Sequence, residues 1–427
     1  MEKFKQGNRS LREGIASLAI VQGAEYLIPL LALPYLLRVL GPEEFGKIAF
    51  VQAFCMYFVV ATEYGFNLTG TRLIAIHRHD KQALSRTFWE IQCIKGTLFA
   101  ASAILLALLI ALFGKLNNLS GILFVGLLPV LGCVMYPLWL LQGLERMREA
   151  AMLMIAARVA MLCGVLMFVN GPNDLLLAAA LQFGATPIAG IASWVLLVRG
   201  RDVHWVSPSI GGLMRNMSES WHTFLATAAS TLYRSSNAVI LGLMSGPAAV
   251  AYYSLAEKIV KAAQEVNRPI SQATYPRISA LAAQSREAAS PLLRRVFIAI
   301  AGLSLAVSSA LFIFAADIIR ILGGAGFQAT VPVLLIMAFV PLIGGLNSVL
   351  GVQTMLPFGF SAQFSRCVLM AGIFNITIIT PLVVLFAERG AALCFFLSEA
   401  LLLVSMFWFL RQQGFNYFVN LKIAEGH

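Results

Sequence analysis

Charged residues are scarce in this chain of 427 residues, at 12%, whereas hydrophobic residues make up 59%. Soluble globular domains carry about 25% charged residues. This shortage, together with a mean hydropathy of +0.81, excludes an ordinary soluble domain. Several runs approach or exceed the roughly 20 apolar residues that a helix needs to cross a bilayer. They include 97–113, 122–141, 175–198 and 391–410. Because these runs are continuously apolar and do not alternate, they predict membrane helices and not a barrel of strands.

Motifs for metal, disulfide and nucleotide chemistry are also missing. The six cysteines all fall within predicted spans, form no CxxC pair and have no histidine at metal-ligating spacing. We therefore expect no disulfide framework, no metal site and no cofactor. The motifs GxxxxGK[ST], GxSxG and HExxH do not occur. The sequence thus predicts a protein that is not an enzyme, and any uphill movement of a substrate must draw on an ion gradient or on a process that consumes the product.

Hydropathy predicts twelve membrane spans. They lie at 14–37, 47–71, 88–114, 119–142, 150–169, 174–198, 220–243, 249–275, 292–315, 329–355, 364–386 and 390–410. Of the 31 Lys and Arg residues, 20 fall in the termini and connections on one side, 5 in connections on the other side and 6 within spans. Because basic residues concentrate on the cytoplasmic side of a membrane, both termini are predicted to be cytoplasmic.

A short internal repeat divides these spans into halves. Gly41-Pro42 follows the first span, and Gly246-Pro247 follows the seventh, 205 residues later. Six spans separate the two turns, so the halves share one orientation, related by a pseudo-two-fold axis along the membrane normal. The predicted fold is an all-α polytopic membrane protein of 12 transmembrane helices in two six-helix lobes. The N-lobe comprises 1–200, the cytoplasmic inter-lobe linker 201–219 and the C-lobe 220–427.

Two lobes that face each other form a central cleft, which is the architecture of a transporter. No long extramembrane loop separates the predicted spans, and this argues against a membrane glycan polymerase or ligase. The net charge of +11 is spread over short loops. It therefore indicates topology and contact with anionic membrane lipids, and not nucleic-acid binding.

A polar stripe follows the eighth predicted span. At 100° per residue, one arc of about 80° contains Ser254, Lys258, Lys261, Glu265, Arg268 and Gln272. A charge at bilayer depth costs on the order of 3 kcal/mol, so a net-cationic stripe implies a water-filled cavity or an anionic partner. We expect Glu265 to offset part of the charge of Lys258 and Lys261. Two interpretations stay open, a salt-bridge network without a ligand and a cation-lined vestibule for an anionic substrate.

The seventh predicted span carries a second stripe. Its members within about 80° are Thr223, Thr227, Ser230, Arg234 and Asn237. Hydroxyls beside a guanidinium suit phosphate and sugar recognition, because Arg offers a planar fork of donors and the hydroxyls both donate and accept. Hydroxyls at this spacing also allow close packing between helices, which is the alternative for them.

Three further charged residues within the predicted spans, Glu25, Glu63 and Arg158, are candidates for the site. Arg158 is a lone cation in the fifth span and is expected either to line the cavity or to pair with Glu63 or Glu25. A buried carboxylate beside cations can change its protonation during transport. Glu25 and Glu63, with Glu265, are therefore candidates for ion coupling, and a structural role is the alternative for Glu25 and Glu63.

Four segments together resemble one family. They are Leu40 to Gly46, Glu63 to Arg72, Ala256 to Lys261 with Tyr275-Pro276-Arg277, and Ile319 to Gly323 with Gly326-Phe327. The chain resembles, from end to end, the bacterial polysaccharide-biosynthesis flippases. These form the O-antigen (Wzx-type) branch of the multidrug/oligosaccharidyl-lipid/polysaccharide exporter superfamily.

The resemblance implies a flippase of the bacterial inner membrane. Such a protein moves undecaprenyl-pyrophosphate-linked oligosaccharide from the cytoplasmic to the periplasmic leaflet by alternating access, with or without coupling to a cation, beside the polysaccharide polymerase machinery. The pyrophosphate agrees with the independently inferred cationic stripe. The residues expected to bind the substrate are Arg158, Arg234, Asn237, Lys258, Lys261, Arg268 and Gln272. A drug or metabolite exporter of the same superfamily is the alternative, although cationic substrates would favour an acidic cavity.

Overall fold

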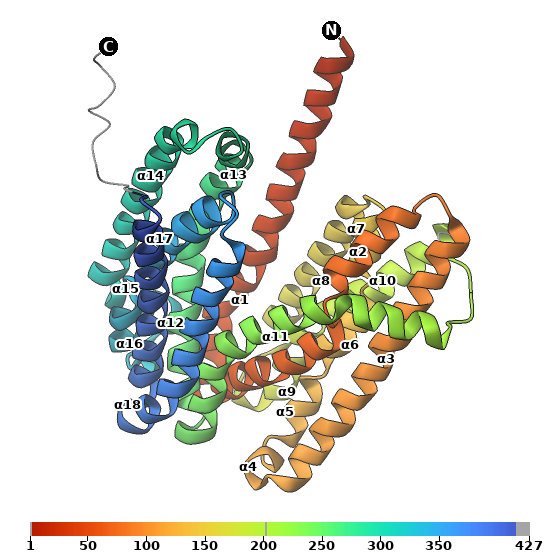
Figure 1. The fold of residues 1–427 in the computed structure, drawn as a ribbon. Helices are drawn as coiled ribbons and strands as arrows, with labels where there is room; N and C mark the ends of the chain where they lie inside the picture. Colours follow the sequence, from red (N-terminus) through yellow and green to blue (C-terminus); the bar gives the residue numbers. More distant parts are fainter. Residues whose placement is uncertain (1, 201–202, 416–427) are drawn as a thin grey trace, which may run out of the picture. The chain divides into compact units, whose positions relative to one another are not determined.

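The computed structural model describes residues 2–200 and 203–415, without the side chains of residues 2–27, 29, 30 and 233. Helices dominate these ranges, and no strand occurs in them (Figure 1). The predicted all-helical fold is therefore confirmed. The chain forms two compact units. The first consists of Met1–Ala251 with Leu322–Gly326, and the second of Tyr252–Ile321 with Phe327–His427. The N-lobe, linker and C-lobe boundaries stay a prediction.

Seven helices in the described ranges are long and apolar enough to cross a membrane, or eight if one bent pair is a single span. The seven are Leu31–His77, Lys81–Leu112, Ser120–Gly143, Met147–Phe168, Arg286–Ile313, Thr330–Met355 and Ser361–Gln412. The bent pair is Pro172–Phe183 with Ala185–Gly200. The chain is a multi-pass membrane protein, and the number twelve stays a prediction. The predicted seventh and eighth spans are absent from this set because they carry the polar stripes.

The first unit is built from helices α1 to α11. Their bounds are α1 Glu2–Glu63, α2 Phe66–His77, α3 Lys81–Leu112, α4 Gly114–Asn117, α5 Ser120–Val125, α6 Leu128–Met135, α7 Leu138–Gly143, α8 Met147–Phe168, α9 Leu175–Phe183, α10 Ala185–Gly200 and α11 Ile210–Ser245, with a 3₁₀ turn at Pro172–Asp174. Side-chain caps fix two helix starts. The Asp80 carboxylate accepts from the amides of Gln82 and Ala83 at the start of α3, and the Ser209 hydroxyl accepts from Gly212 N at the start of α11.

Both Gly-Pro turns of the predicted repeat have the same backbone geometry. Gly41 interrupts α1 at φ 72° and ψ 177°. Gly246, between α11 and α12, has φ 85° and ψ 176°. This region of backbone space is essentially restricted to glycine, and the following proline is suited to the first turn of the next helix. The local sequence therefore sets the same sharp change of direction at both places.

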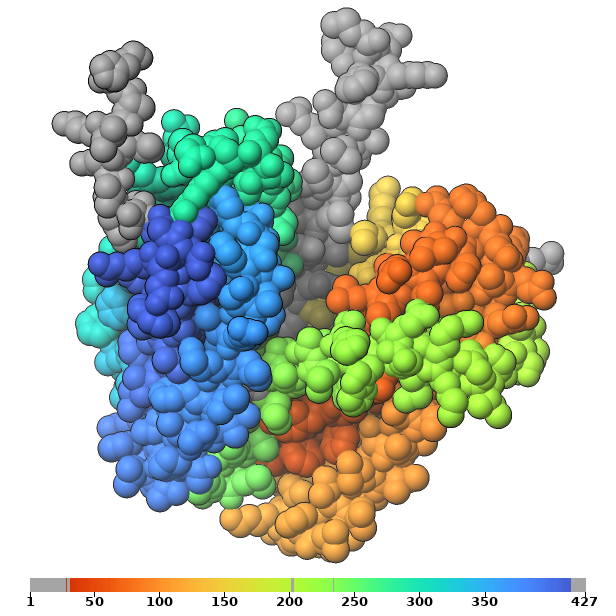
Figure 2. Space-filling view, viewed as in Figure 1, coloured from red at the N-terminus to blue at the C-terminus, as the bar shows by residue number. Residues whose placement is uncertain are grey.

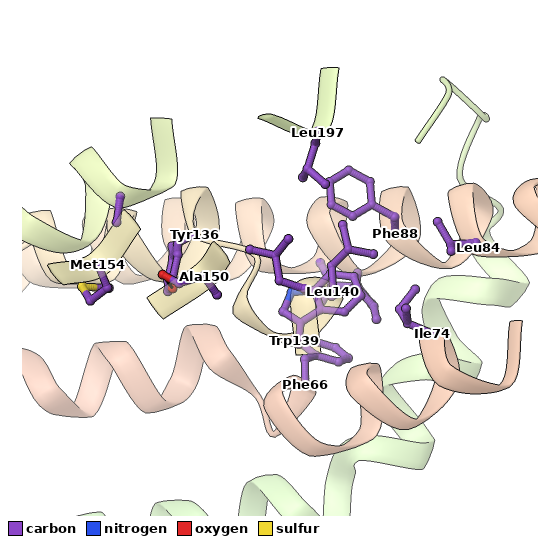
Figure 3. Close-up of a cluster of buried hydrophobic side chains, with 14 of the residues drawn as sticks. Phe66, Ile74, Leu84, Phe88, Tyr136, Trp139, Leu140, Ala150, Met154 and Leu197 are labelled. Atoms are coloured by element: carbon purple, nitrogen blue, oxygen red, sulfur yellow. Dashed lines mark hydrogen bonds between the residues drawn. The ribbon is translucent and has the colours of Figure 1, made fainter. Parts of the chain in front are cut away.

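A hydrophobic cluster in the first unit seats the short helix α2 (Figure 3). Phe66 and Ile74 of α2 lie fully buried with Phe88 of α3 and Trp139 of α7. Gly70 faces the indole of Trp139 so closely that an added Cβ would lie 2.9 Å from its Cε3. The Thr71 hydroxyl also donates to the carbonyl oxygen of Trp139 over 3.1 Å. One face of α2 is thus fixed in the core.

The second unit contains most of α12 and the helices that follow it. The bounds are α12 Pro247–Gln264, α13 Arg268–Ala282, α14 Arg286–Ile313, α15 Ala315–Gly323, α16 Thr330–Met337, α17 Val340–Asn347 and α18 Ser361–Gln412, with a π-helical stretch at Ser348–Met355 and 3₁₀ turns at Glu265–Asn267 and Ala325–Phe327. Ala387, at φ 47°, breaks α18. This break lies between the predicted spans 364–386 and 390–410, so the predicted separation of these spans is present.

Candidate functional site

The predicted site residues are distributed over both compact units. The first unit holds Glu25, Glu63, Arg158, Arg234 and Asn237, and the second unit holds Lys258, Lys261, Glu265, Arg268 and Gln272. The side chain of Glu25 lies outside the described residues. Each group is therefore described within its own unit.

The helix that carries the cationic stripe is broken, which the sequence prediction of one continuous span at 249–275 missed. Helix α12 ends at Gln264, a 3₁₀ turn covers Glu265–Asn267, and α13 begins at Arg268 with Pro269 in its first turn. Proline removes a backbone donor and favours a new helix start. Arg268 and Gln272 therefore lie on a different helix from Lys258 and Lys261.

The ion pairs along this stripe also differ from the expected ones. Lys261 Nζ lies 2.9 Å from Glu257 Oε1, and Arg268 Nη1 lies 3.0 Å from Glu265 Oε2. The sequence predicts instead that Glu265 offsets part of the charge of Lys258 and Lys261. With two carboxylates against three cations, Lys258 included, the stripe keeps a net charge of +1. Lys261 is exposed, Lys258 and Arg268 are half-buried, and Gln272 is exposed. The stripe therefore stays accessible and cationic. Its net charge is lower than the expected one, because two carboxylates lie beside the cations instead of one.

On α11, the hydroxyl groups and the guanidinium differ in what they can offer. The Thr227 hydroxyl donates to Thr223 O over 2.9 Å, and the Ser230 hydroxyl donates to Thr227 O over 2.9 Å. Their protons are used within the helix, so only their oxygen lone pairs face outward as acceptors. Asn237 is buried, whereas Arg234 is exposed. Arg234 is thus the accessible donor of this stripe. Figure 2 shows part of the surface of α11 in yellow-green.

Glu63, which is half-buried, belongs to a polar cluster of three residues that the sequence does not predict. Its carboxylate forms a hydrogen bond with the Cys133 thiol of α6 and interacts electrostatically with Lys95 of α3. Lys95 is only 1% exposed. Arg158 is half-buried on α8. Lys95 lies within a predicted span, and the free-energy cost of a buried cation marks it as a candidate. Its interaction with Glu63 could not be predicted, because the two residues are 32 residues apart along the chain.

One buried carboxylate, Glu90, is absent from the predicted site residues. Glu90 of α3 is 1% exposed and accepts from Ser209 Oγ at 2.8 Å and from Asn216 Nδ2 at 2.9 Å. An added Cβ at Gly212 would collide with the Glu90 carboxylate. Glu90 therefore holds the start of α11 against α3. The signal was again an acidic residue inside an apolar span.

The matching family model carries the description "Polysaccharide biosynthesis protein" and covers residues 11–282. Two curated relatives are both named "Putative O-antigen transporter". The one from Escherichia coli (strain K12) is 34% identical over 402 residues, which is 94% of this chain and 97% of the relative. The one from Shigella dysenteriae is 28% identical over 399 residues, which is 93% of this chain and 99% of the relative.

Two solved structures show the same fold at low identity. The lipid II flippase MurJ in an inward closed conformation has a TM-score of 0.77 and 10% identity, with 92% of this chain and 87% of that chain covered. A multidrug resistance MATE family transporter of the MOP superfamily, in its inward-facing conformation, has a TM-score of 0.72 and 14% identity, with 91% and 94% covered. With the family model matching well over half of its length, the chain belongs to the polysaccharide biosynthesis protein family.

Proposed function

We propose that the protein is a flippase for undecaprenyl-pyrophosphate-linked oligosaccharide, an O-antigen or related repeat unit. It moves this lipid from the cytoplasmic to the periplasmic leaflet of the bacterial inner membrane by alternating access, with both termini in the cytoplasm. The names of the two relatives support the substrate class. The observation that carries the proposal is the presence of accessible cations on helices of a membrane protein, Arg234 on α11 and Lys261 on α12.

The substrate chemistry matches these cations. A pyrophosphate needs positive charge and N–H donors as it leaves the aqueous leaflet surface, and a guanidinium or ammonium group supplies both. Arg234, Lys258, Lys261 and Arg268 attract the headgroup in this proposal, together with Arg158. Asn237 and Gln272 belong to the same proposed substrate-binding set. The prenyl chain stays in lipid, and the polymerase machinery that receives the glycan is the proposed partner.

Ion coupling is assigned to the carboxylates. Glu63 has the strongest support, because it interacts electrostatically with a buried cation, Lys95. Protonation of Glu63 would leave Lys95 without its counter-charge, so proton uptake there is coupled to a rearrangement of α1 against α3 in this proposal. Glu265, which already pairs with Arg268, is the second candidate, and Glu25 is the third.

Export of glycan from cells tests the function. Cells that lack their own flippase receive the wild-type chain or its Arg234→Gln, Lys258→Gln or double variant, and surface glycan is quantified. We expect wild type to restore export and the double variant to lose most of it, because the headgroup loses two charged donors. Arg389→Gln is the matched control, since Arg389 is an exposed cation outside the stripes. Full export by the double variant, inserted at wild-type level, contradicts the proposed role of these cations.

A further inference from the structure

A polar pocket lies in the first unit, apart from the cationic stripes. Its volume is about 320 Å³, and it is lined by Thr69, Arg72 and Leu73 of α2 and by Glu219 of α11. This volume falls in the range of about 300–1,000 Å³ that small-molecule sites occupy. The pocket combines a guanidinium, a carboxylate and a hydroxyl with one apolar side chain.

Both walls of the pocket are fixed by contacts behind them. Helix α2 is seated by Phe66 and Ile74 in the hydrophobic cluster (Figure 3). The hydroxyls of Thr69 and Ser220 lie 2.6 Å apart and join α2 to α11. Asn216, one turn before Ser220, is held by Glu90. Arg72 and Glu219 therefore project from a rigid frame, as a binding site requires.

The two charged groups of the pocket, Arg72 and Glu219, can both bind a ligand. Among the described residues, neither Arg72 nor Glu219 has an ion-pair partner, although both line the same pocket. Nearby surface charges do pair, since Arg78 Nη1 lies 2.8 Å from Glu145 Oε1. The pocket thus offers a fork of donors on one wall and a carboxylate acceptor on the other.

This combination selects the chemistry of the ligand. A phosphate would be attracted by Arg72 and repelled by Glu219, and a cation would meet the reverse. A neutral sugar satisfies both groups, because its hydroxyls accept hydrogen bonds from the guanidinium and donate them to the carboxylate. Leu73 offers an apolar surface for the C–H face of a ring. A sugar therefore fits all four residues, and it is also the class that the proposed substrate supplies.

The pocket also opens at the start of the polar stripe of α11. At 100° per residue, Glu219 falls in the same arc as Thr223, Thr227 and Arg234. Arg234 is fifteen residues further along this helix, about 22 Å at 1.5 Å per residue. Arg72 and Glu219 both lie in segments that the distribution of basic residues assigns to the cytoplasm, where the substrate begins its path.

We infer that the pocket formed by Thr69, Arg72, Leu73 and Glu219 is a glycan subsite, which binds one neutral sugar residue of the lipid-linked oligosaccharide on the cytoplasmic side. This inference rests on the proposed function and adds to it a sugar-reading site separate from the cations that attract pyrophosphate. It predicts that the protein distinguishes a glycan-bearing lipid from the same lipid without glycan.

Binding to paired lipids tests the subsite. The full chain in nanodiscs is titrated with undecaprenyl pyrophosphate alone and with the same lipid carrying N-acetylglucosamine, N-acetylgalactosamine or galactose. Wild type is expected to bind at least one sugar-bearing lipid more tightly than the sugar-free lipid. Arg72→Gln and Glu219→Gln should each weaken that binding about tenfold and leave the sugar-free lipid within about twofold, because each removes a charged hydrogen-bonding group.

Matched variants and the remaining outcomes make the test decisive. Arg78→Gln and Glu145→Gln change the same charges outside the pocket and should leave both affinities unchanged. Equal weakening of both lipids by the Glu219 and Arg72 variants, or no weakening, overturns the subsite alone. Equal binding of all lipids by wild type also overturns it. Failure of wild type to bind any of these lipids overturns the proposed function and, with it, the subsite.

Discussion

Asn216 of α11 donates a hydrogen bond from Nδ2 to Oε2 of Glu90 on α3 over 2.9 Å, and both side chains are buried. Ser209 Oγ donates to the other carboxylate oxygen over 2.8 Å. A carboxylate inside a membrane helix is tolerated only with such donors. Glu90 therefore connects the segment before α11 and the first turns of α11 to α3, and this connection orients the polar face of α11.

Removing the Asn216 amide should destabilise the first unit. Asn216→Ala leaves one oxygen of a buried carboxylate without its donor, which costs about 1–3 kcal/mol. Thermal unfolding of the purified protein in detergent measures the loss. In a Glu90→Gln background the same substitution should cost clearly less, because the charge is gone. Equal costs in both backgrounds would show that the contact contributes no charge-assisted hydrogen bond.

Lys95, which is buried, and Glu63, which is half-buried, should respond asymmetrically to substitution. Glu63→Gln removes a carboxylate that interacts electrostatically with the fully buried Lys95, and it should destabilise the first unit. Lys95→Met leaves a half-buried carboxylate that water can reach, so its cost should be smaller. The double variant should be more stable than Glu63→Gln alone. A double-mutant cycle by thermal unfolding measures the coupling.

An exposed pair provides the comparison for this cycle. Arg320 Nη2 lies 2.8 Å from Asp317 Oδ1 on the surface. Neutralising either residue should cost at most about 1 kcal/mol, because solvent screens an exposed pair. Additive effects for Lys95 and Glu63, as small as those of Arg320 and Asp317, would argue against electrostatic coupling between Lys95 and Glu63.

Gly70 should not tolerate a methyl group. In Gly70→Ala the new Cβ lies 2.9 Å from Trp139 Cε3, and the fully buried indole has no room to move. Overpacking of this kind costs about 1–3 kcal/mol. Gly96→Ala is the control, since a Cβ there meets nothing within 4 Å, and it should be neutral or stabilise the helix by up to about 1 kcal/mol. Comparison of the two melting temperatures checks the close approach of α2 to Trp139.

The two Gly-Pro turns should be equally sensitive. Gly41→Ala and Gly246→Ala meet no atom within 4 Å, so any cost is conformational. At φ 72° and 85° that cost is about 1–3 kcal/mol. Gly171, at φ −165°, also has open space and should accept alanine without loss. A large effect at only one of Gly41 and Gly246 would contradict their equivalence in the repeat.

Features set by local chemistry could be predicted from the sequence. The Gly-Pro turns and the separation of the two halves of α18 follow from residues next to one another, and each lies where the sequence predicts it. The continuous eighth span failed for a local reason that was visible, because Pro269 starts a new helix after the turn at Glu265–Asn267. The apolar pattern around Pro269 predicts one helix, but the proline starts a second one.

Partners of charged side chains could not be predicted in the same way. Lys261 has a carboxylate one turn away in each direction, Glu257 and Glu265, and helical spacing alone cannot choose between them. Lys95 and Glu63 come from different helices, so only packing brings them together. The polar pocket likewise needs α2 and α11, whose nearest ends, His77 and Ile210, are 133 residues apart along the chain. Sequence patterns predict which face of a helix carries such residues, but they do not predict which other helix packs against that face.

The central claim is that cations on these membrane helices carry a pyrophosphate-linked glycan across the bilayer. Leaflet-resolved transport in proteoliposomes tests it most directly, with a fluorescent undecaprenyl-pyrophosphate oligosaccharide whose accessibility to an external quencher is followed over time. Wild type should move the lipid between leaflets, and the Arg234→Gln/Lys258→Gln variant should be slower by at least about tenfold, as expected when two charged contacts are lost. Transport by the double variant at the wild-type rate, or no transport by wild type, would contradict the account.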